Sequence, residues 1–419
     1  MRKKIQHAII LFALAPIFIL SCKKEINRQD EQQEFPSSAN NSNRNNAKRI
    51  TVADVNQLYT AVNDAENAGA VIILSPGTYV LNAAHPNAGR IELLADMQLQ
   101  GQPGHPEQVI IDASALPGAS FTPPLNFPAA RTGAIRMGRG FNSVEWVTVQ
   151  GNASAQALSI IETDLIWTPG ISHVRVAHSI ITGGRIGIDI RNVGLASSGR
   201  VLEAEISNNE ITENLVQQGQ GIEIQNANGA SDAVIRATLN GNYVHGNKIG
   251  LRSFNNNANN TSTNNGSITI QSNDDRFEEN GIGLFINAGL NQGTTTTCNG
   301  NLLLFEAHGT SIKNNQGTVP PAPETTPPCG LFVVGGYALN SNLTSNNRVD
   351  MSLWGCTIYN NHGASDILTY GAYSSSTIPA GTNNIVAINL YGVSQNASFI
   401  ATPSFPVESA GTNIVTITR

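Results

Sequence analysis

An apolar residue followed three positions later by asparagine recurs along this chain, and no other feature limits its fold as strongly. The pattern occurs at Val149…Asn152, Ile211…Asn214, Val244…Asn247, Phe277…Asn280, Ile312…Asn315 and Ile358…Asn361, and Ile181…Gly184 fills the one gap. Successive apolar positions are 32, 30, 33, 33, 35 and 46 residues apart. Such a period predicts a solenoid, in which each coil must stack on its neighbours to bury its apolar face.

A second strand, usually opened by glycine, follows each of these turns. These segments are residues 187–190, 221–224, 250–253, 283–286 and 330–333. Their apolar residues alternate with other types, which is typical of a strand with one buried face. The composition agrees, because Gly, Asn, Thr and Ser are abundant and only 13% of residues are charged. No helical periodicity separates the strands, which excludes leucine-rich and helical solenoids.

Stacked coils would place the recurrent asparagines above one another as a ladder of side-chain amides. In this respect residues 50–395 resemble the right-handed parallel β-helix repeat family. The start of the body adds to the resemblance. Asp54 suits a helix N-cap, apolar residues follow at helical spacing over 55–65, and a strand at 71–74 precedes Pro76-Gly77-Thr78-Tyr79. This order resembles the opening of pectate-lyase-like proteins and implies an all-β, right-handed parallel β-helix with an N-terminal capping helix.

The first residues indicate export rather than structure. A basic start at residues 2–4 precedes a short apolar run at 9–20, and Ile19-Leu20-Ser21-Cys22 resembles a bacterial lipobox. We expect lipidation at Cys22, and Lys23 favours the outer membrane; an ordinary cleaved signal is the alternative. The polar segment after Cys22 cannot bury a core and predicts a disordered tether. The expected parts are a lipoprotein signal peptide (1–21), the tether (22–48) and the β-helix (49–419).

Charge and cysteine usage narrow the partners. The formal net charge is −6 and no basic patch is present, so we expect no nucleic-acid partner. Export permits disulfides, and Cys298–Cys329 and Cys329–Cys356 are the two sensible pairings. At least one of Cys298, Cys329 and Cys356 must stay free, and none has zinc-ligand spacing. We expect a monomer held at the membrane by its lipid.

Function should lie on the outward side of the glycine-opened strands. In a common register that column is Asp189, Glu223, Arg252, Phe285, Phe332 and Leu368. We expect Asp189, Glu223, Arg252 and Lys248 to be catalytic, because paired carboxylates act on glycosidic bonds and a Lys or Arg can abstract a proton from a uronate. Arg185 and Arg191 would bind substrate. The carboxylates could also hold Ca²⁺. The alternative is a stabilising charge ladder without chemistry.

Aromatic residues offer a further set of binding candidates. Phe285, with Phe332 and Tyr370, would form an outward row that stacks on sugar rings, and Trp167 lies in a loop where it could do the same. The alternative is that the Pro-rich segment 316–328 covers the row. His245 follows the inward Val244 and is either a base or an inert turn residue.

Two hypotheses follow. The first is a surface lipoprotein that binds and cleaves a polysaccharide, as a lyase or glycoside hydrolase. The second is a non-catalytic structural or adhesive β-helix. The Asn-Thr-Asp and Gly-His-Gly motifs of polygalacturonase-like enzymes and the Trp-Ile-Asp-His stretch of pectate lyases are missing. No catalytic residue can therefore be carried over from those families.

Overall fold

A computed structural model of the protein describes twelve stretches of the chain. They are residues 47–116, 133–152, 159–163, 171–216, 219–257, 261–316, 328–338, 344–361, 365–374, 381–394, 397–405 and 413–419. They belong to one compact unit, Ala47–Arg419. None of the helices in these stretches is both apolar enough and long enough to span a membrane. The predicted signal peptide and Cys22 fall outside the described residues.

Three parallel sheets build the body, with 12, 9 and 10 strands among the described residues. Sheet A contains β1 (Arg49–Val52), β2 (Val71–Leu74), β5 (Gln98–Gln100), β8 (Phe141–Glu145), β11 (Ile171–Ala177), β14 (Val201–Ser207), β17 (Val234–Asn240), β20 (Ser267–Asn273), β23 (Leu302–His308), β26 (Arg348–Trp354), β29 (Ile385–Tyr391) and β31 (Ile414–Thr418). Sheet B contains β3 (Gly77–Val80), β6 (Val109–Asp112), β9 (Thr148–Gln150), β12 (Ile180–Thr182), β15 (Glu210–Thr212), β18 (Tyr243–His245), β21 (Arg276–Glu278), β24 (Ser311–Lys313) and β27 (Thr357–Tyr359). Sheet C contains β4 (Ile91–Glu92), β7 (Ile135–Met137), β10 (Ser159–Thr163), β13 (Ile186–Val193), β16 (Gln220–Ala227), β19 (Ile249–Asn256), β22 (Ile282–Asn291), β25 (Cys329–Ala338), β28 (Ile367–Ser374) and β30 (Phe399–Phe405).

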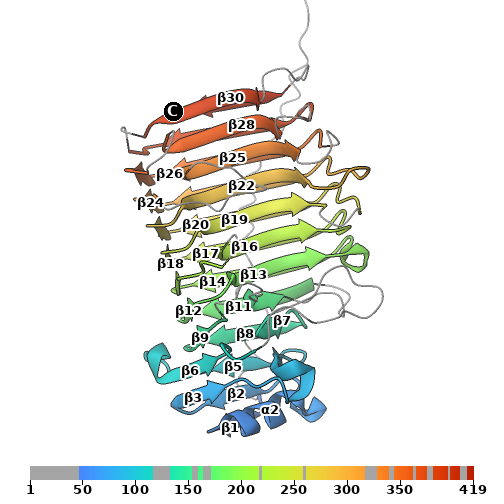
Figure 1. The fold of residues 1–419 in the computed structure, drawn as a ribbon, viewed down its shortest axis with the longest axis vertical. Coiled ribbons are helices and arrows are strands. Elements are labelled where there is room, and N and C mark those ends of the chain that lie inside the picture. Colours follow the sequence, from blue (N-terminus) through green and yellow to red (C-terminus); the bar gives the residue numbers. More distant parts are fainter. Residues whose placement is uncertain are drawn as a thin grey trace, which may run out of the picture. The chain divides into compact units, whose positions relative to one another are not determined.

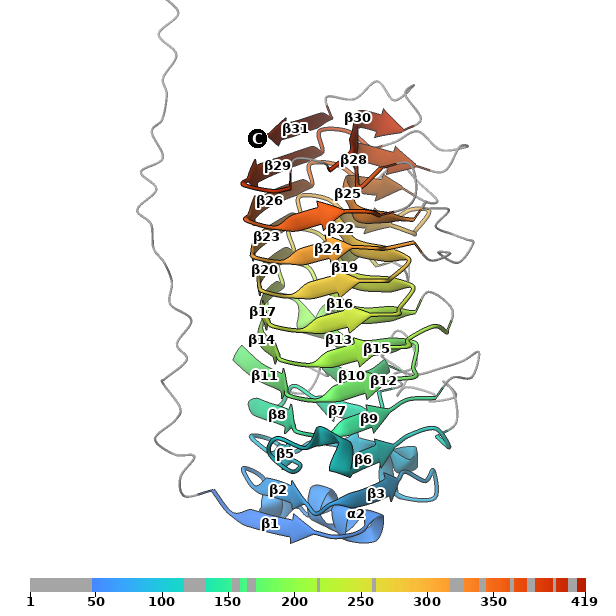
Figure 2. The ribbon, with the colours of Figure 1, turned by 90° about the vertical axis from the view of Figure 1, so that its left-hand side faces the viewer.

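From β2 to β29 the chain visits sheets A, B and C in turn, and strands within each sheet pair in parallel with their equivalents one coil earlier and one coil later. Figure 1 shows the strands of sheet C stacked from β13 to β30, and Figure 2 shows the neighbouring sheets after a quarter turn. The result is a right-handed parallel β-helix, as predicted. Stacking of this kind pairs the backbone groups of every coil without a helix on either face.

Aliphatic side chains from all three sheets fill the bore of the solenoid. One coil supplies Leu202 and Ile206 from β14, Ile211 from β15 and Ile222 from β16, and all four are fully buried. The predicted apolar repeat forms a continuous row, because Ile211 pairs in register with Ile181 on one side and with Val244 on the other. Each fully buried aliphatic side chain contributes about 1.5–3 kcal/mol relative to an exposed one.

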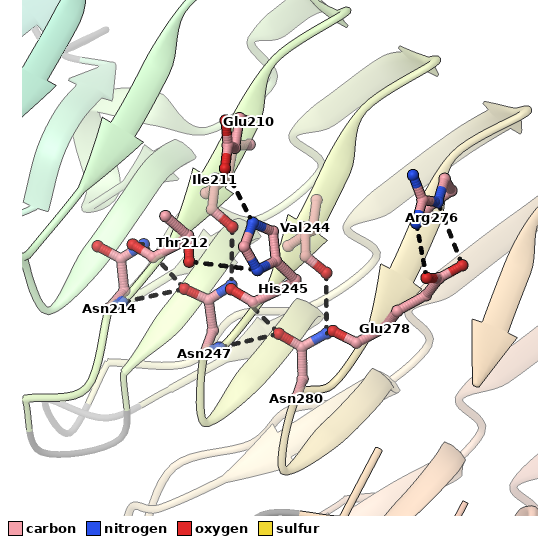
Figure 3. Close-up of polar contacts among 10 residues, drawn as sticks. All are labelled: Glu210, Ile211, Thr212, Asn214, Val244, His245, Asn247, Arg276, Glu278 and Asn280. Atoms are coloured by element: carbon pink, nitrogen blue, oxygen red, sulfur yellow. Dashed lines mark hydrogen bonds and ion pairs between the residues drawn. The ribbon is translucent and has the colours of Figure 1, made fainter. Parts of the chain in front are cut away.

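The predicted asparagine ladder is present at the corner between sheets B and C (Figure 3). The backbone amide and the side-chain amide of Asn214 both donate to Oδ1 of Asn247, each at 3.0 Å. Asn247 donates in the same way to Asn280, and the ladder continues through Asn315 and Asn361. The ladder satisfies backbone groups that the sheets leave unpaired at this corner.

Three further polar ladders, which the sequence interpretation did not predict, run along the other corners. Their members are Asn209, Asn242 and Asp275 between sheets A and B; Asn192, Asn226 and Asn255 at the end of sheet C; and Asn301, Asn347, Asn384 and Asn413 before sheet A. All of these residues are buried. At every corner of the coil, a column of buried side chains therefore supplies hydrogen bonds to polar groups at the sharp bend.

A short helix covers the N-terminal end of the bore. Asp54 caps the N-terminus of helix α2 (Val55–Asn63), and its side chain accepts a hydrogen bond from the Gln57 amide at 2.9 Å. Its buried face consists of Leu58, Tyr59, Ala61 and Val62. The helix is two residues shorter than predicted, because Asp64 ends it and caps a separate 3₁₀ turn, η1 (Ala65–Asn67). The other 3₁₀ turns are η2 (Pro86–Gly89), η3 (Pro106–Gln108) and η4 (Leu195–Ser197).

The three body cysteines are free and buried, so neither predicted disulfide forms. Cys356 packs within the bore, whereas Cys329 belongs to an apolar cluster on the outer side of sheet C. Cys298 lies in the turn between sheets C and A, where its thiol donates to the Asn255 carbonyl at 3.3 Å. The pairings fail because the coil places the three thiols at different points of its cross-section.

Candidate functional site

The outward column on sheet C has the predicted register. Asp189 pairs with Glu223, Glu223 with Arg252, and Arg252 with Phe285. The column then continues through Phe332 to Leu368. It also extends toward the N-terminus beyond the predicted residues, to Glu162, Arg136 and Glu92. We call the outward side of sheet C, from β4 to β28, the C face.

A glycine at the second position of β13, β16, β19, β22 and β25 shapes the C face. A Cβ atom on Gly221 would lie 2.5 Å from a methyl carbon of Val244 and 2.8 Å from the Gly250 carbonyl oxygen, so only glycine fits. The outward column before these glycines lies within reach of the outward column after them. Ser159, on β10, shows this by donating a hydrogen bond to Oδ2 of Asp189 on the next coil at 3.1 Å.

Ion pairs connect the charged half of the C face from coil to coil. Arg136 lies 3.2 Å from Glu92 and 3.6 Å from Glu162. Arg191 bridges the next two carboxylates, with Nη2 2.5 Å from Oε2 of Glu162 and Nη1 3.1 Å from Oδ2 of Asp189. One guanidinium therefore holds the carboxylates of two adjacent coils.

Ion pairing continues on the next coils. Nη1 of Arg252 lies 3.8 Å from Oε2 of Glu223, and the Gln225 amide donates to the other carboxylate oxygen of Glu223. The guanidinium of Arg252 also lies over the Phe254 ring, 4.3 Å from its centre, and 5.4 Å from the centre of Phe285. Arg252 thus stands where the charged half of the face meets an aromatic half.

These charges are buried, which corrects the expectation of a solvated sheet face. Glu162 and Asp189 are 0% exposed, and Arg136, Glu223 and Arg252 are at most 8% exposed. Removing so many charges from water costs several kcal/mol each, and ion pairing offsets this cost only in part. A buried charged column is therefore an expensive way to stabilise a sheet.

Asp189 has the most perturbed acid–base behaviour on the face. Burial, together with the negative charges of Glu223 and Glu162, raises the pKa of Asp189 to about 7 against the lowering effects of Arg191 and the Ser159 hydroxyl. A carboxyl group with this pKa exchanges its proton near neutral pH, as a general acid or base must.

Several residues of this cluster were missed by the sequence interpretation. Glu162, Arg90, Glu92 and Arg136 are not among the predicted site residues. Arg90 is 1% exposed, and burial lowers its pKa, opposed by the nearby Glu162. The signal was available in Ile161-Glu162, which matches Ile188-Asp189 one coil later, but β10 has no opening glycine to mark the register.

The aromatic half of the C face is buried as well. Phe285 and Phe332 are each 1% exposed and meet edge to face with ring centres 5.0 Å apart. They belong to an apolar cluster separate from the bore, against which Tyr370 and Tyr373 pack. Phe285 is therefore not an open platform for a sugar ring. The finding agrees with the alternative that the aromatic row is covered.

The remaining predicted residues lie at the edge of the face or outside the described chain. Arg185 directly precedes β13, and Lys248 directly precedes β19. Both residues are half-buried. They therefore stand at the same end of their strands, beside the asparagine ladder. Trp167 falls outside the described residues. No group of three or more His, Cys, Asp or Glu side chains in the described stretches is arranged to hold a metal ion.

His245 lies on sheet B, away from the C face (Figure 3). Its ring stacks on Tyr243 at 4.0 Å, and its Nε2 lies 3.1 Å from Glu210. Arg276 covers Tyr243, with its guanidinium 4.0 Å from the ring centre, and pairs with Glu278 at 2.9 Å. This packed set on the outer side of sheet B fits a structural role for His245.

Comparisons with known proteins give structural matches only. No protein-family model matches the chain, and no curated protein matches it in sequence. The A-module of the Azotobacter vinelandii mannuronan C-5 epimerase AlgE4 is 14% identical, with a TM-score of 0.46 over 88% of this chain and 96% of that one. The AlgE6 A-module of the same organism is 13% identical, with a TM-score of 0.35 over 86% and 93% of the two chains. The catalytic domain of a GH87 α-1,3-glucanase in complex with nigerose is 10% identical, with a TM-score of 0.36 over 89% and 68%.

Proposed function

We propose that the C face binds a polysaccharide and that Asp189 and Glu223 carry acid–base chemistry on it. The observation that supports this most strongly is the column of carboxylates and guanidinium groups from Glu92 to Arg252, whose members from Arg136 onward are buried. Perturbed and desolvated ionisable groups of this kind are typical of functional sites. The column repeats along the solenoid axis and so offers similar contacts to successive units of a polymer.

The two carboxylates have environments that suit different roles. Asp189, with a pKa raised to about 7, can donate a proton to a leaving oxygen. Glu223 lies beside Arg252 and Gln225, which stabilise its charged form and suit it to act as the anionic partner. Their strands are adjacent and in register, about 4.8 Å apart. That backbone spacing is compatible with the carboxyl separation of about 5–5.5 Å found in retaining glycosidases.

The non-catalytic alternative has its own support, because ion pairs already engage most of these side chains. In that version the C face holds a polysaccharide without cleaving it. Incubation of the protein with a panel of polysaccharides separates the two versions, if reducing ends and the absorbance of unsaturated uronates are followed. Product formation that Asp189→Asn abolishes supports chemistry at the C face. Binding without product, unaffected by Asp189→Asn, leaves only the adhesive version.

Binding itself is tested with two matched arginine variants. Arg252→Gln removes a guanidinium from the C face, and Arg236→Gln removes one from the outer side of sheet A, where Arg236 pairs with Glu203 at 3.3 Å. We expect Arg252→Gln to weaken polysaccharide binding about tenfold or more, measured by calorimetry, since charge-assisted hydrogen bonds contribute about 1.5–3 kcal/mol. Arg236→Gln should bind like the wild type. Equal effects of the two variants would contradict a site on the C face.

We further propose that the body is attached to the outer membrane by a lipid on Cys22. The lipobox-like segment that ends in Cys22 supports this. The intact mass of the mature protein tests it. A chain that begins at Cys22 with acyl groups attached is the expected result, and an unmodified N-terminus would refute it.

A further inference from the structure

Four buried polar atoms on three neighbouring residues of the C face have no hydrogen-bond partner in the described structure. They are Nε of Arg185, Oδ1 of Asp189, and both amide atoms of Gln220. Gln220 and Asp189 are each 0% exposed. An unpaired buried polar group costs about 1–3 kcal/mol, so three such residues in one place need an explanation.

The three residues lie together on two adjacent coils. Gln220 pairs in register with Ile186, the residue after Arg185, and its backbone amide donates to the Arg185 carbonyl at 2.8 Å. Ser159, Ile186 and Gln220 form one outward column, and the Ser159–Asp189 hydrogen bond shows that Asp189, beyond Gly187, lies within reach of this column across neighbouring coils. The unpaired atoms therefore converge on the same part of the C face.

The neighbours of Gln220 in its own column show that an amide is not required for packing. Ile186 precedes it, and Ile249 and Ile282 follow it in register, all buried. An isoleucine would fit a buried strand position of this kind and would carry no unpaired polar atom. The chain instead places a glutamine here, at a cost in stability.

We propose that Gln220, Asp189 and Arg185 form a subsite that binds a pair of hydroxyl groups on one sugar unit of the polysaccharide. The proposal rests on the proposed function of the C face and specifies what one unit of the ligand must present. A hydroxyl both donates and accepts, so a pair of them can satisfy the Asp189 and Gln220 oxygens and the Gln220 and Arg185 nitrogens together. A carboxylate or phosphate has no proton to offer the two oxygens, and Asp189 would repel it above neutral pH.

Gln220→Ile tests the subsite, with Gln220→Met as a second variant and Gln271→Ile on sheet A as the control. Binding of the full-length protein is measured at pH 8 with the polysaccharide selected from the panel and with its O-acetylated derivative, which lacks hydroxyl donors. We expect the wild type to prefer the native polymer. Gln220→Ile should bind it about tenfold more weakly and lose the preference, since two neutral hydrogen bonds contribute about that factor. Its melting temperature should rise by about 2 °C, because an unpaired amide is removed.

Each other outcome has a distinct meaning. Gln220→Ile and Gln220→Met that melt higher but bind like the wild type would overturn the subsite, because the unpaired amide would then have no part in binding. Variants that melt lower than the wild type and than Gln271→Ile would show that the amide is paired in the free protein, which also overturns it. A wild type that binds no polysaccharide refutes the proposed function itself, and the subsite with it.

Discussion

At the scale of single residues, the interior asparagines hold the coils in register. Asn247 has two roles, because it accepts two hydrogen bonds from Asn214 and donates two to Asn280. We predict that Asn247→Ala lowers the free energy of unfolding by about 2 kcal/mol or more, because it leaves the buried amide donors of Asn214 without an acceptor. Urea unfolding followed by circular dichroism measures this. Asn240→Ala, at an exposed position on sheet A, is the control and should cost less than about 0.5 kcal/mol.

The buried carboxyl of Asp189 predicts how stability depends on pH. Its pKa is about 3.8 when unfolded and about 7 when folded, so the folded protein binds the extra proton between these values. The contribution of protonated Asp189 to the free energy of unfolding is complete below about pH 4 and is lost as the pH rises toward 7. Between pH 5 and 8 the wild type should therefore lose on the order of 2 kcal/mol more than Asp189→Asn, as judged by unfolding at each pH. Equal losses in the two proteins would show that Asp189 is not protonated in the folded state.

The buried thiols give a simpler residue-scale prediction. Burial raises the pKa of Cys298 to about 12 and also raises the pKa of Cys329 and Cys356. Since the thiolate is the reactive form, all three should resist a thiol reagent in the folded protein and react after denaturation. A folded protein in which two of them stay unreactive after denaturation without reductant would instead contain the disulfide that the structure lacks.

The sequence predicted individual residues well only where a pattern repeated without gaps. The asparagine ladder between sheets B and C could be predicted because an apolar residue always stands three positions before it. The other three ladders could not, because one mixes Asn with Asp275, one stops after three coils, and the members of the third, from Asn301 to Asn413, are unevenly spaced, at 46, 37 and 29 residues. Arg90 and Arg136 could not be predicted as site residues for a related reason. The coils around them have short strands and no opening glycine, so nothing in the local sequence fixes their register.

At the scale of elements, the capping helix α2 is the part whose loss should matter most. It covers an end of the bore where apolar residues would otherwise meet water. We predict that Leu58→Ala lowers the free energy of unfolding by about 2–5 kcal/mol, as for other fully buried leucines, whereas Thr60→Ala on the exposed side of α2 changes it little. Urea unfolding of both variants measures the difference. A Leu58→Ala protein as stable as Thr60→Ala would mean that α2 does not seal the bore.

Element boundaries show which physical information the sequence carried. The terminal strands β29 and β31 can be recognised from the sequence, because alternation of apolar residues marks a half-buried strand directly. The outward residues of sheet C were expected at a solvated surface and are buried instead. Alternation identifies which side of a strand faces the bore, but it carries no information about what lies against the other side.

At the scale of the whole body, one architecture serves two purposes. The bore supplies stability through stacked aliphatic residues, and this leaves the outer side of sheet C free to carry charges that stability alone would not select. The same stacking that repeats Ile181, Ile211 and Val244 inside also repeats Glu162, Asp189 and Glu223 outside. A linear polymer aligned with the coils would therefore meet related contacts at each step.

The most direct test of this account is a crystal structure of the protein with an oligosaccharide cut from the polysaccharide it binds. The account predicts the sugar on the C face between β10 and β19, with one unit hydrogen-bonded to Gln220 and Asp189. A sugar seated on the outer side of sheet A or sheet B, with the atoms of the C face unchanged, would contradict it.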